Sequence, residues 1–104
     1  MTQQQAVDLV EFLKIVAARP GMFFGKADIL LAQVFLSGFG AALSKSIGLD
    51  PTLYEKVATE RGWQRPKATG PGIEGQMLET GMSDEQVVAE LVAIEIEVIQ
   101  RSTE

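Results

Sequence analysis

Capping boxes mark the start of a helix near each end of this 104-residue chain. In a capping box, a Ser or Thr and a Gln three residues later satisfy backbone N–H groups that a helix start leaves free. The two pairs are Thr2 with Gln5 and Ser83 with Gln86. Apolar residues recur at helical spacing after both pairs. The sequence therefore predicts helices over about residues 3–18 and 84–101.

The second of these segments contains an alternating pattern as well. Residues Ile94 to Ile99 read "IEIEVI", and their β-branched side chains at period two would suit a strand. The capping box and the length of the segment favour a helix. No other part of the chain is a candidate strand with which this one could pair.

Two further helices are expected between these ends. The apolar segment 27–47 precedes Gly48, a good terminating residue in the left-handed conformation. It is apolar on most of its circumference, which predicts the central, buried helix of the fold. Asp50-Pro51 is typical of an N-cap followed by proline at the first helical position, which predicts a short helix over 51–61.

The stretch 62–82 is rich in glycine and proline at its start and is predicted to be a loop. The expected fold class is all-α. The expected architecture is a small irregular four-helix bundle that forms a single domain over residues 1–104.

Composition limits the function of the chain. It contains neither cysteine nor histidine, which removes the thiolate nucleophile, the cysteine metal site and the commonest general base. No paired carboxylates with catalytic or metal-binding spacing emerge. We therefore expect no enzyme activity, no catalytic residue, no cofactor and no metal. Hydrophobic residues make up 46% of this small chain, which favours a homodimer that buries part of them in an interface.

Charge is distributed unevenly. The net charge is −5, but residues 1–72 contain eight basic and six acidic residues, whereas residues 73–104 contain one basic and eight acidic residues. The acidic end argues against nucleic acid as a partner. Glu90 and Glu97 lie in this end, on what is predicted to be a solvated face of the last helix. That face would suit a basic protein partner, or it serves only to keep an apolar protein soluble.

The sequence also bears on location. The N-terminus begins Thr-Gln-Gln-Gln and does not resemble a basic and then apolar signal peptide. The longest apolar run, Ile29 to Leu43, is interrupted by Gln33 and Ser37 and is shorter than the roughly 20 residues that span a bilayer. These features predict a cytoplasmic protein that does not contact a membrane.

One loop carries a candidate ligand site. Trp63, Arg65 and Lys67 interleave cations with an aromatic ring, which is the composition of an anion-binding loop. The alternative is that Trp63 anchors the loop onto the helices. Gly70, Gly72 and Gly75 spell G-x-G-x-x-G, but the chain leaves no room for the strand–helix–strand unit that a dinucleotide site requires.

The segment "RPGMFFG" (residues 19–25) joins the first two expected helices. Pro20 and the two glycines predict a corner. Phe23 and Phe24 are interpreted as an apolar plug beneath it, with an exposed contact for a partner as the alternative.

The same segment carries two resemblances. It is similar to the "RPGMYIG" segment of gyrase-type ATPases, but the acidic and asparagine residues that such a site needs do not follow it. It resembles more closely small uncharacterised bacterial helical proteins with an "RPGM-aromatic-x-G" motif before an apolar helix. Here the resemblance covers about residues 15–45, which include the step "SGFG" at 37–40. That resemblance implies a toxin–immunity or stress-related gene neighbourhood and no catalytic residues.

Together these patterns predict a non-enzymatic protein-interaction module, immunity-like or regulatory, that self-associates through an apolar helix surface. The alternative is a small-molecule or anion binder that uses the loop Trp63–Gly75 next to Phe23 and Phe24.

Overall fold

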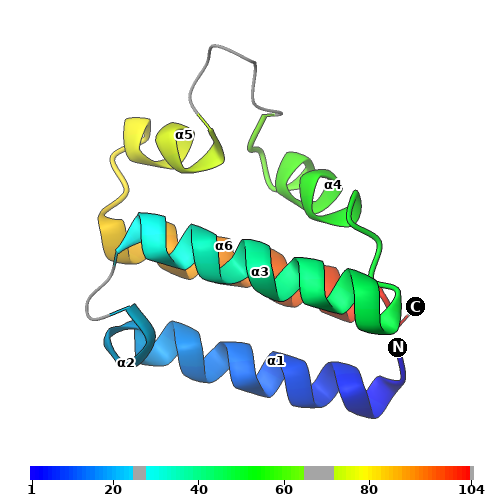
Figure 1. Ribbon diagram of the computed structural model, residues 1–104. Coiled ribbons are helices and arrows are strands. Elements are labelled where there is room, and N and C mark those ends of the chain that lie inside the picture. Colours follow the sequence, from blue (N-terminus) through cyan, green and yellow to red (C-terminus); the bar gives the residue numbers. More distant parts are fainter. Residues whose placement is uncertain (25–27, 65–71, 104) are drawn as a thin grey trace.

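The structure, a computed structural model, describes residues 1–24, 28–64 and 72–103 of the chain. These residues form six helices and no strand (Figure 1). The helices are α1 (Gln3–Ala18), α2 (Pro20–Phe24), α3 (Ile29–Ile47), α4 (Leu53–Glu60), α5 (Ile73–Glu79) and α6 (Asp84–Arg101). The all-α class is confirmed, and the stretch Ile94 to Ile99 lies within α6 as helix. The number of helices is six where four were expected.

Both predicted capping boxes are present. The hydroxyl of Thr2 accepts a hydrogen bond from the Gln5 amide at 3.1 Å, and the Thr2 amide donates to the side chain of Gln5 at 2.8 Å. Ser83 and Gln86 make the same pair of bonds at 3.2 and 2.8 Å. The bounds of α1 and α6 are those that the sequence predicted. Local capping chemistry therefore fixes where these two helices begin.

The centre of the fold is α6. Helices α1, α3, α4 and α5 all pack against it. In Figure 1, α1 runs antiparallel to α3 and α6, and both chain termini lie at the same end of the molecule. Eight residues of α6 are buried, against three of α3. The expectation that the apolar helix at 27–47 would be central is therefore wrong.

Helix α3 begins and ends as local chemistry dictates. The carboxylate of Asp28 accepts a hydrogen bond from the Leu31 amide at 3.0 Å, and Gly48 closes the helix in the left-handed conformation with φ of 73°. By length and composition alone, α3 is long and apolar enough to cross a membrane, and a core helix of a soluble protein can pass the same test. Only 11% of its most apolar stretch is buried within the chain.

Two short helices occupy segments that the sequence did not assign to helix. Pro20 ends the predicted helix 3–18, but it also opens α2, because proline is well suited to a first helical position. The predicted loop 62–82 contains α5, whose residue Met77 is fully buried. Helix α4 is shorter than the predicted 51–61, and its N-cap is Thr52, so the expectation that Asp50 caps it and Pro51 opens it is wrong. Asp50 instead accepts hydrogen bonds from the amide and hydroxyl of Thr52 just ahead of the helix.

Candidate functional site: a pocket with a buried carboxylate

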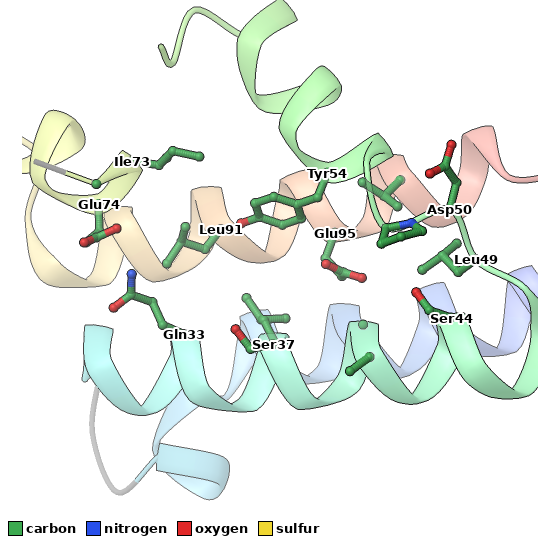
Figure 2. Close-up of a pocket in the computed structure, with 16 residues that line it drawn as sticks. Gln33, Ser37, Ser44, Leu49, Asp50, Tyr54, Ile73, Glu74, Leu91 and Glu95 are labelled. Atoms are coloured by element: carbon green, nitrogen blue, oxygen red, sulfur yellow. The ribbon is translucent and has the colours of Figure 1, made fainter. Parts of the chain in front are cut away.

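A pocket of about 470 Å³ lies between α3 on one side and α4 and α5 on the other, with α6 as its floor (Figure 2). This volume falls in the range of small-ligand sites. Leu36, Leu49, Ile73, Leu91 and Val98 give the pocket apolar walls. Its polar lining consists of Gln33, Ser37, Ser44, Asp50, Tyr54, Glu74 and Glu95. The pocket thus combines an apolar interior with a small set of polar groups.

Glu95 is the most unusual residue of the pocket. It projects from α6 toward α3, and its residue exposure is only 3%. A Cβ atom at Gly40 of α3 would lie 3.7 Å from its Oε1 atom, so the carboxylate lies against the α3 backbone. Among the described residues, Glu95 has no hydrogen-bond or ion-pair partner. Burial alone raises its pKa to about 7, because loss of water disfavours the charged form.

Other acidic groups surround this carboxylate. Tyr54 reaches into the pocket from α4, and burial together with the charge of Glu95 raises the pKa of its phenol. Glu74 and Asp50 line the pocket toward its two ends (Figure 2). None of the described lining residues is a lysine or arginine. The charged side chains that the described lining contains are therefore all acidic.

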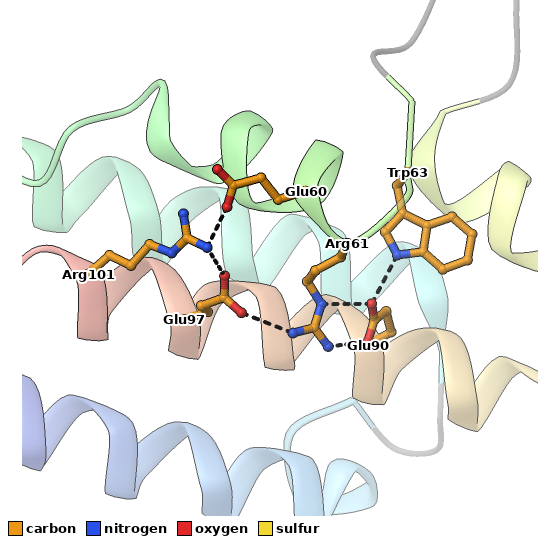
Figure 3. A network of polar contacts seen from close by, with 6 residues as sticks. All are labelled: Glu60, Arg61, Trp63, Glu90, Glu97 and Arg101. Atoms are coloured by element: carbon orange, nitrogen blue, oxygen red, sulfur yellow. Dashed lines mark hydrogen bonds and ion pairs between the residues drawn. The ribbon is translucent and has the colours of Figure 1, made fainter.

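A polar network on the other side of α4 joins that helix to α6 (Figure 3). Arg61 donates to both carboxylate oxygens of Glu90, from Nη2 at 2.7 Å and from Nε at 3.0 Å. The indole Nε1 of Trp63 donates to Glu90 Oε2 at 2.9 Å. The hydrogen bond from Arg61, followed by that from Trp63, lowers the pKa of Glu90 below its ordinary value. Such charge-assisted bonds contribute about 1.5–3 kcal/mol each, reduced here by the partial exposure of Arg61.

Glu97 belongs to the same network. It accepts from Arg61 Nη1 at 3.2 Å and forms an ion pair with Arg101 at 2.8 Å. Arg101 also contacts Glu60 of α4. Glu90 and Glu97 are therefore partly buried and paired within the chain. The expectation that they lie on a solvated face of the last helix is wrong.

The other predicted site residues fall into separate places. Trp63 packs against the core and is held by Glu90, as expected of a residue that anchors its loop. Arg65 and Lys67 lie outside the described residues. Among the described residues, the rings of Phe23 and Phe24 contact other phenylalanines and not Trp63. The described residues thus do not place Trp63 beside Phe23 and Phe24.

Five phenylalanines form one cluster between α1, α2 and α3. Phe24 is buried and meets Phe35 edge-on at 5.7 Å between ring centroids, whereas Phe23 is 37% exposed and meets Phe12 at 5.8 Å. Phe12 and Phe35 also stack on Phe39. The corner at Pro20 therefore has a buried plug in Phe24 and a partly exposed ring in Phe23.

The apolar surface of α3 that faces solvent is the second candidate site. We define the outer α3 face by its exposed residues Leu30, Leu31, Val34, Gly38 and Ala42. Leu30 is 67% exposed and Val34 is 64% exposed. At 3.6 residues per turn, these positions share one side of the helix. Contiguous exposed apolar surface is typical of binding sites, which makes the outer α3 face a candidate.

Sequence reasoning missed the pocket and treated Glu95 only as part of the acidic surface of the last helix. The sequence did contain a sign that Glu95 is buried. It lies four residues after Leu91 and three before Val98, on the apolar stripe of its own helix. The pocket had no such signal, since it depends on how α4 and α5 are placed over α6.

Comparisons with known protein families, with curated proteins and with solved structures gave no match to this chain. The resemblance of the "RPGM-aromatic-x-G" motif to small bacterial helical proteins stays a prediction.

Proposed function

We propose that this chain is a non-enzymatic, cytoplasmic protein-interaction module that forms a homodimer through the outer α3 face. The observation that carries this proposal is the exposure of the most apolar helix of the fold. Large side chains such as Leu30 and Val34 face water, although burying each of them is worth about 1.5–3 kcal/mol. A second copy that presents the same face would cover them on both chains at once.

The shape of the outer α3 face suits another helix. Gly38 and Ala42 follow the large residues along the same side of α3. A Cβ atom at Gly38 would meet no atom within 4 Å, so the backbone is accessible there. Small residues of this kind allow two helices to approach closely, with the large residues of one packing beside the small residues of the other.

Charge also favours a second copy over a basic partner. Residues 30–42 contain no charged residue, so the apolar stretches of two outer α3 faces do not repel each other. Glu90 and Glu97 have their charges paired with Arg61 and Arg101. A basic protein that binds them would compete with these internal pairs. An immunity-like or regulatory role would then be carried by the dimer.

The test measures the molar mass of the protein over a range of concentrations by sedimentation equilibrium. The wild-type chain is expected to form a dimer. Val34→Lys should weaken association at least about tenfold, because it places a charge in an apolar contact. Leu78→Lys is the matched control, since Leu78 is an exposed leucine of α5, and it should leave the dimer intact. A wild-type chain that is monomeric at every concentration, or equal effects of both substitutions, would contradict the proposal.

A further inference from the structure

The pocket above α6 contains a carboxylate, that of Glu95, for which the described chain supplies no partner. Only 3% of the surface of Glu95 is exposed, and the residue has no charged or hydrogen-bonding partner among the described residues. Among the described residues no fully buried side-chain oxygen lacks a hydrogen-bond partner, so the unpaired oxygens of Glu95 are reached from the pocket. The partner of Glu95 is therefore to be sought in a molecule that enters the pocket.

The lining of the pocket restricts the charge of that molecule. Glu74 and Asp50 line the pocket with Glu95, and Tyr54 adds a phenol that stays neutral across the physiological range. None of the lining side chains that the structure describes is basic. A carboxylate or phosphate would be repelled by these groups, whereas a cation would be attracted.

The rest of the lining restricts its shape and polarity. Leu36, Leu91 and Val98 surround the carboxylate with apolar surface, and the volume of about 470 Å³ exceeds what an inorganic ion needs. Among the described residues, no group of three or more acidic side chains is placed to hold a metal ion. The ligand must fill an apolar space and also carry a positive charge.

We propose that this pocket binds a small organic amine, with its ammonium group on the Glu95 carboxylate and its apolar body between α3, α4 and α6. An ammonium group has three N–H donors. Glu95 accepts from one of them, and the hydroxyls of Ser37, Ser44 and Tyr54 are further acceptors in the same lining. Helix α3 would thus use its outer face for a second copy and an adjoining side for the ligand.

The affinity should depend on pH in a defined direction. Burial keeps Glu95 protonated up to about pH 7, so binding of an ammonium group strengthens as the pH rises through that value. Among the residues that the structure describes, the other titratable groups that face the pocket are Tyr54, Glu74 and Asp50. The pKa of the Tyr54 phenol is raised, and hydrogen bonds from Thr52 lower the pKa of Asp50. Tyr54 and Asp50 therefore keep their charges as the pH passes through 7.

The experiment titrates the full chain with n-hexylamine, n-hexanol and hexanoate by isothermal calorimetry at about pH 8, above the pKa of Glu95. The amine should bind more tightly than the alcohol, and hexanoate should bind least. Glu95→Gln should weaken amine binding by about tenfold or more while it leaves the alcohol nearly unchanged. Glu85→Gln, which makes the same charge change at an exposed position of α6, should leave both unchanged. Circular dichroism verifies that each variant is folded.

A second variant locates the binding. Ser37→Phe places a ring at the rim of the pocket and should abolish binding of the amine and the alcohol alike. The proposal fails if the amine binds wild type no better than the alcohol does, if Glu95→Gln binds the amine as wild type does, or if none of the probes binds. N-acetyl-lysine amide carries the same ammonium group on a peptide backbone. If it binds as tightly as n-hexylamine, the natural cation is a partner's lysine side chain and the small-amine proposal is overturned.

Discussion

Glu90, Glu95 and Glu97 lie within two turns of α6, yet their surroundings give them different chemistry. Glu90 receives two hydrogen bonds from Arg61 and one from Trp63, so its pKa falls. Glu95 has no such donors and is buried, so its pKa rises to about 7. The cause is position on the helix. Glu90 and Glu97 face the arginines, whereas Glu95 shares the stripe of Leu91 and Val98.

The raised pKa of Glu95 predicts how the stability of the protein changes with pH. Between pH 4.5 and about 7 the folded chain holds a proton on Glu95 that the unfolded chain releases. Stability therefore falls as the pH rises through this window, by a total of about 3 kcal/mol from this group. Glu95→Gln removes the effect. Urea unfolding should show the variant more stable than wild type by about 2–3 kcal/mol at about pH 8, and close to it below pH 5.

Glu85→Gln is the control for this measurement, because Glu85 is exposed at the start of α6 and its substitution should not produce a comparable gain at high pH. Equal stability of wild type and Glu95→Gln at both pH values would show that the carboxylate is solvated when the chain is folded. This measurement uses no ligand, so it tests the burial of Glu95 independently of the amine proposal.

At the scale of elements, the strongest sequence signals were those in which a side chain bonds to its own helix end. The bounds of α1 and α6 followed from Thr2 and Ser83, and Gly48 ends α3 in the left-handed conformation as predicted. Such bonds connect residues a few positions apart, so they can be recognised in the sequence alone.

Helices α2 and α5 could not be recognised in this way, since their stability comes from tertiary packing. In α5, the glycine at position 75 disfavours helix, but Met77 is buried in the core and fixes the segment against α6. Pro20 ends α1 and also begins α2, and Phe24 packs this short helix against Phe35. The pocket depends on the placement of α4 and α5 and was unpredictable for the same reason.

The capping box of α6 gives a prediction at this scale. Ser83→Ala removes the acceptor for the Gln86 amide and should destabilise the fold by about 1 kcal/mol in urea unfolding. Ser46→Ala is the control, because Ser46 lies inside α3 and its hydroxyl donates only to the Ala42 carbonyl of its own helix. Ser46→Ala should change the free energy of unfolding by less than about 0.5 kcal/mol. A Ser83→Ala variant as stable as wild type would mean that α6 is fixed by its core packing alone.

At the scale of the whole molecule, the arrangement of helices gives α3 three different sides. Ala32, Leu36 and Leu43 are buried, Gln33, Ser37 and Ser44 line the pocket, and the outer α3 face is exposed. The sequence predicted that α3 is apolar on most of its circumference, and from this we expected α3 to be the central helix. It is exposed because α6, with eight buried residues, fills the centre instead.

This arrangement bears on whether α3, which has the length and composition of a membrane span, enters a bilayer. To do so it would have to leave α6 and expose the apolar residues that α3 and α6 bury together. The polar side chains of Gln33, Ser37 and Ser44 would also lose water, and the acidic residues Asp28 and Asp50 adjoin its two ends. We therefore expect the folded chain to prefer water, with the outer α3 face covered by a second copy.

Flotation with neutral phosphatidylcholine vesicles tests this expectation. The full chain should stay in the aqueous fraction, because inserting α3 would unfold the domain around α6. A synthetic peptide of residues 29–47 should float with the vesicles, because it has no fold to lose and its length of about 28 Å approaches the thickness of the hydrocarbon core. Flotation of the full chain, with Val34→Lys returning it to the aqueous fraction, would instead assign the outer α3 face to lipid and exclude the dimer as its main use.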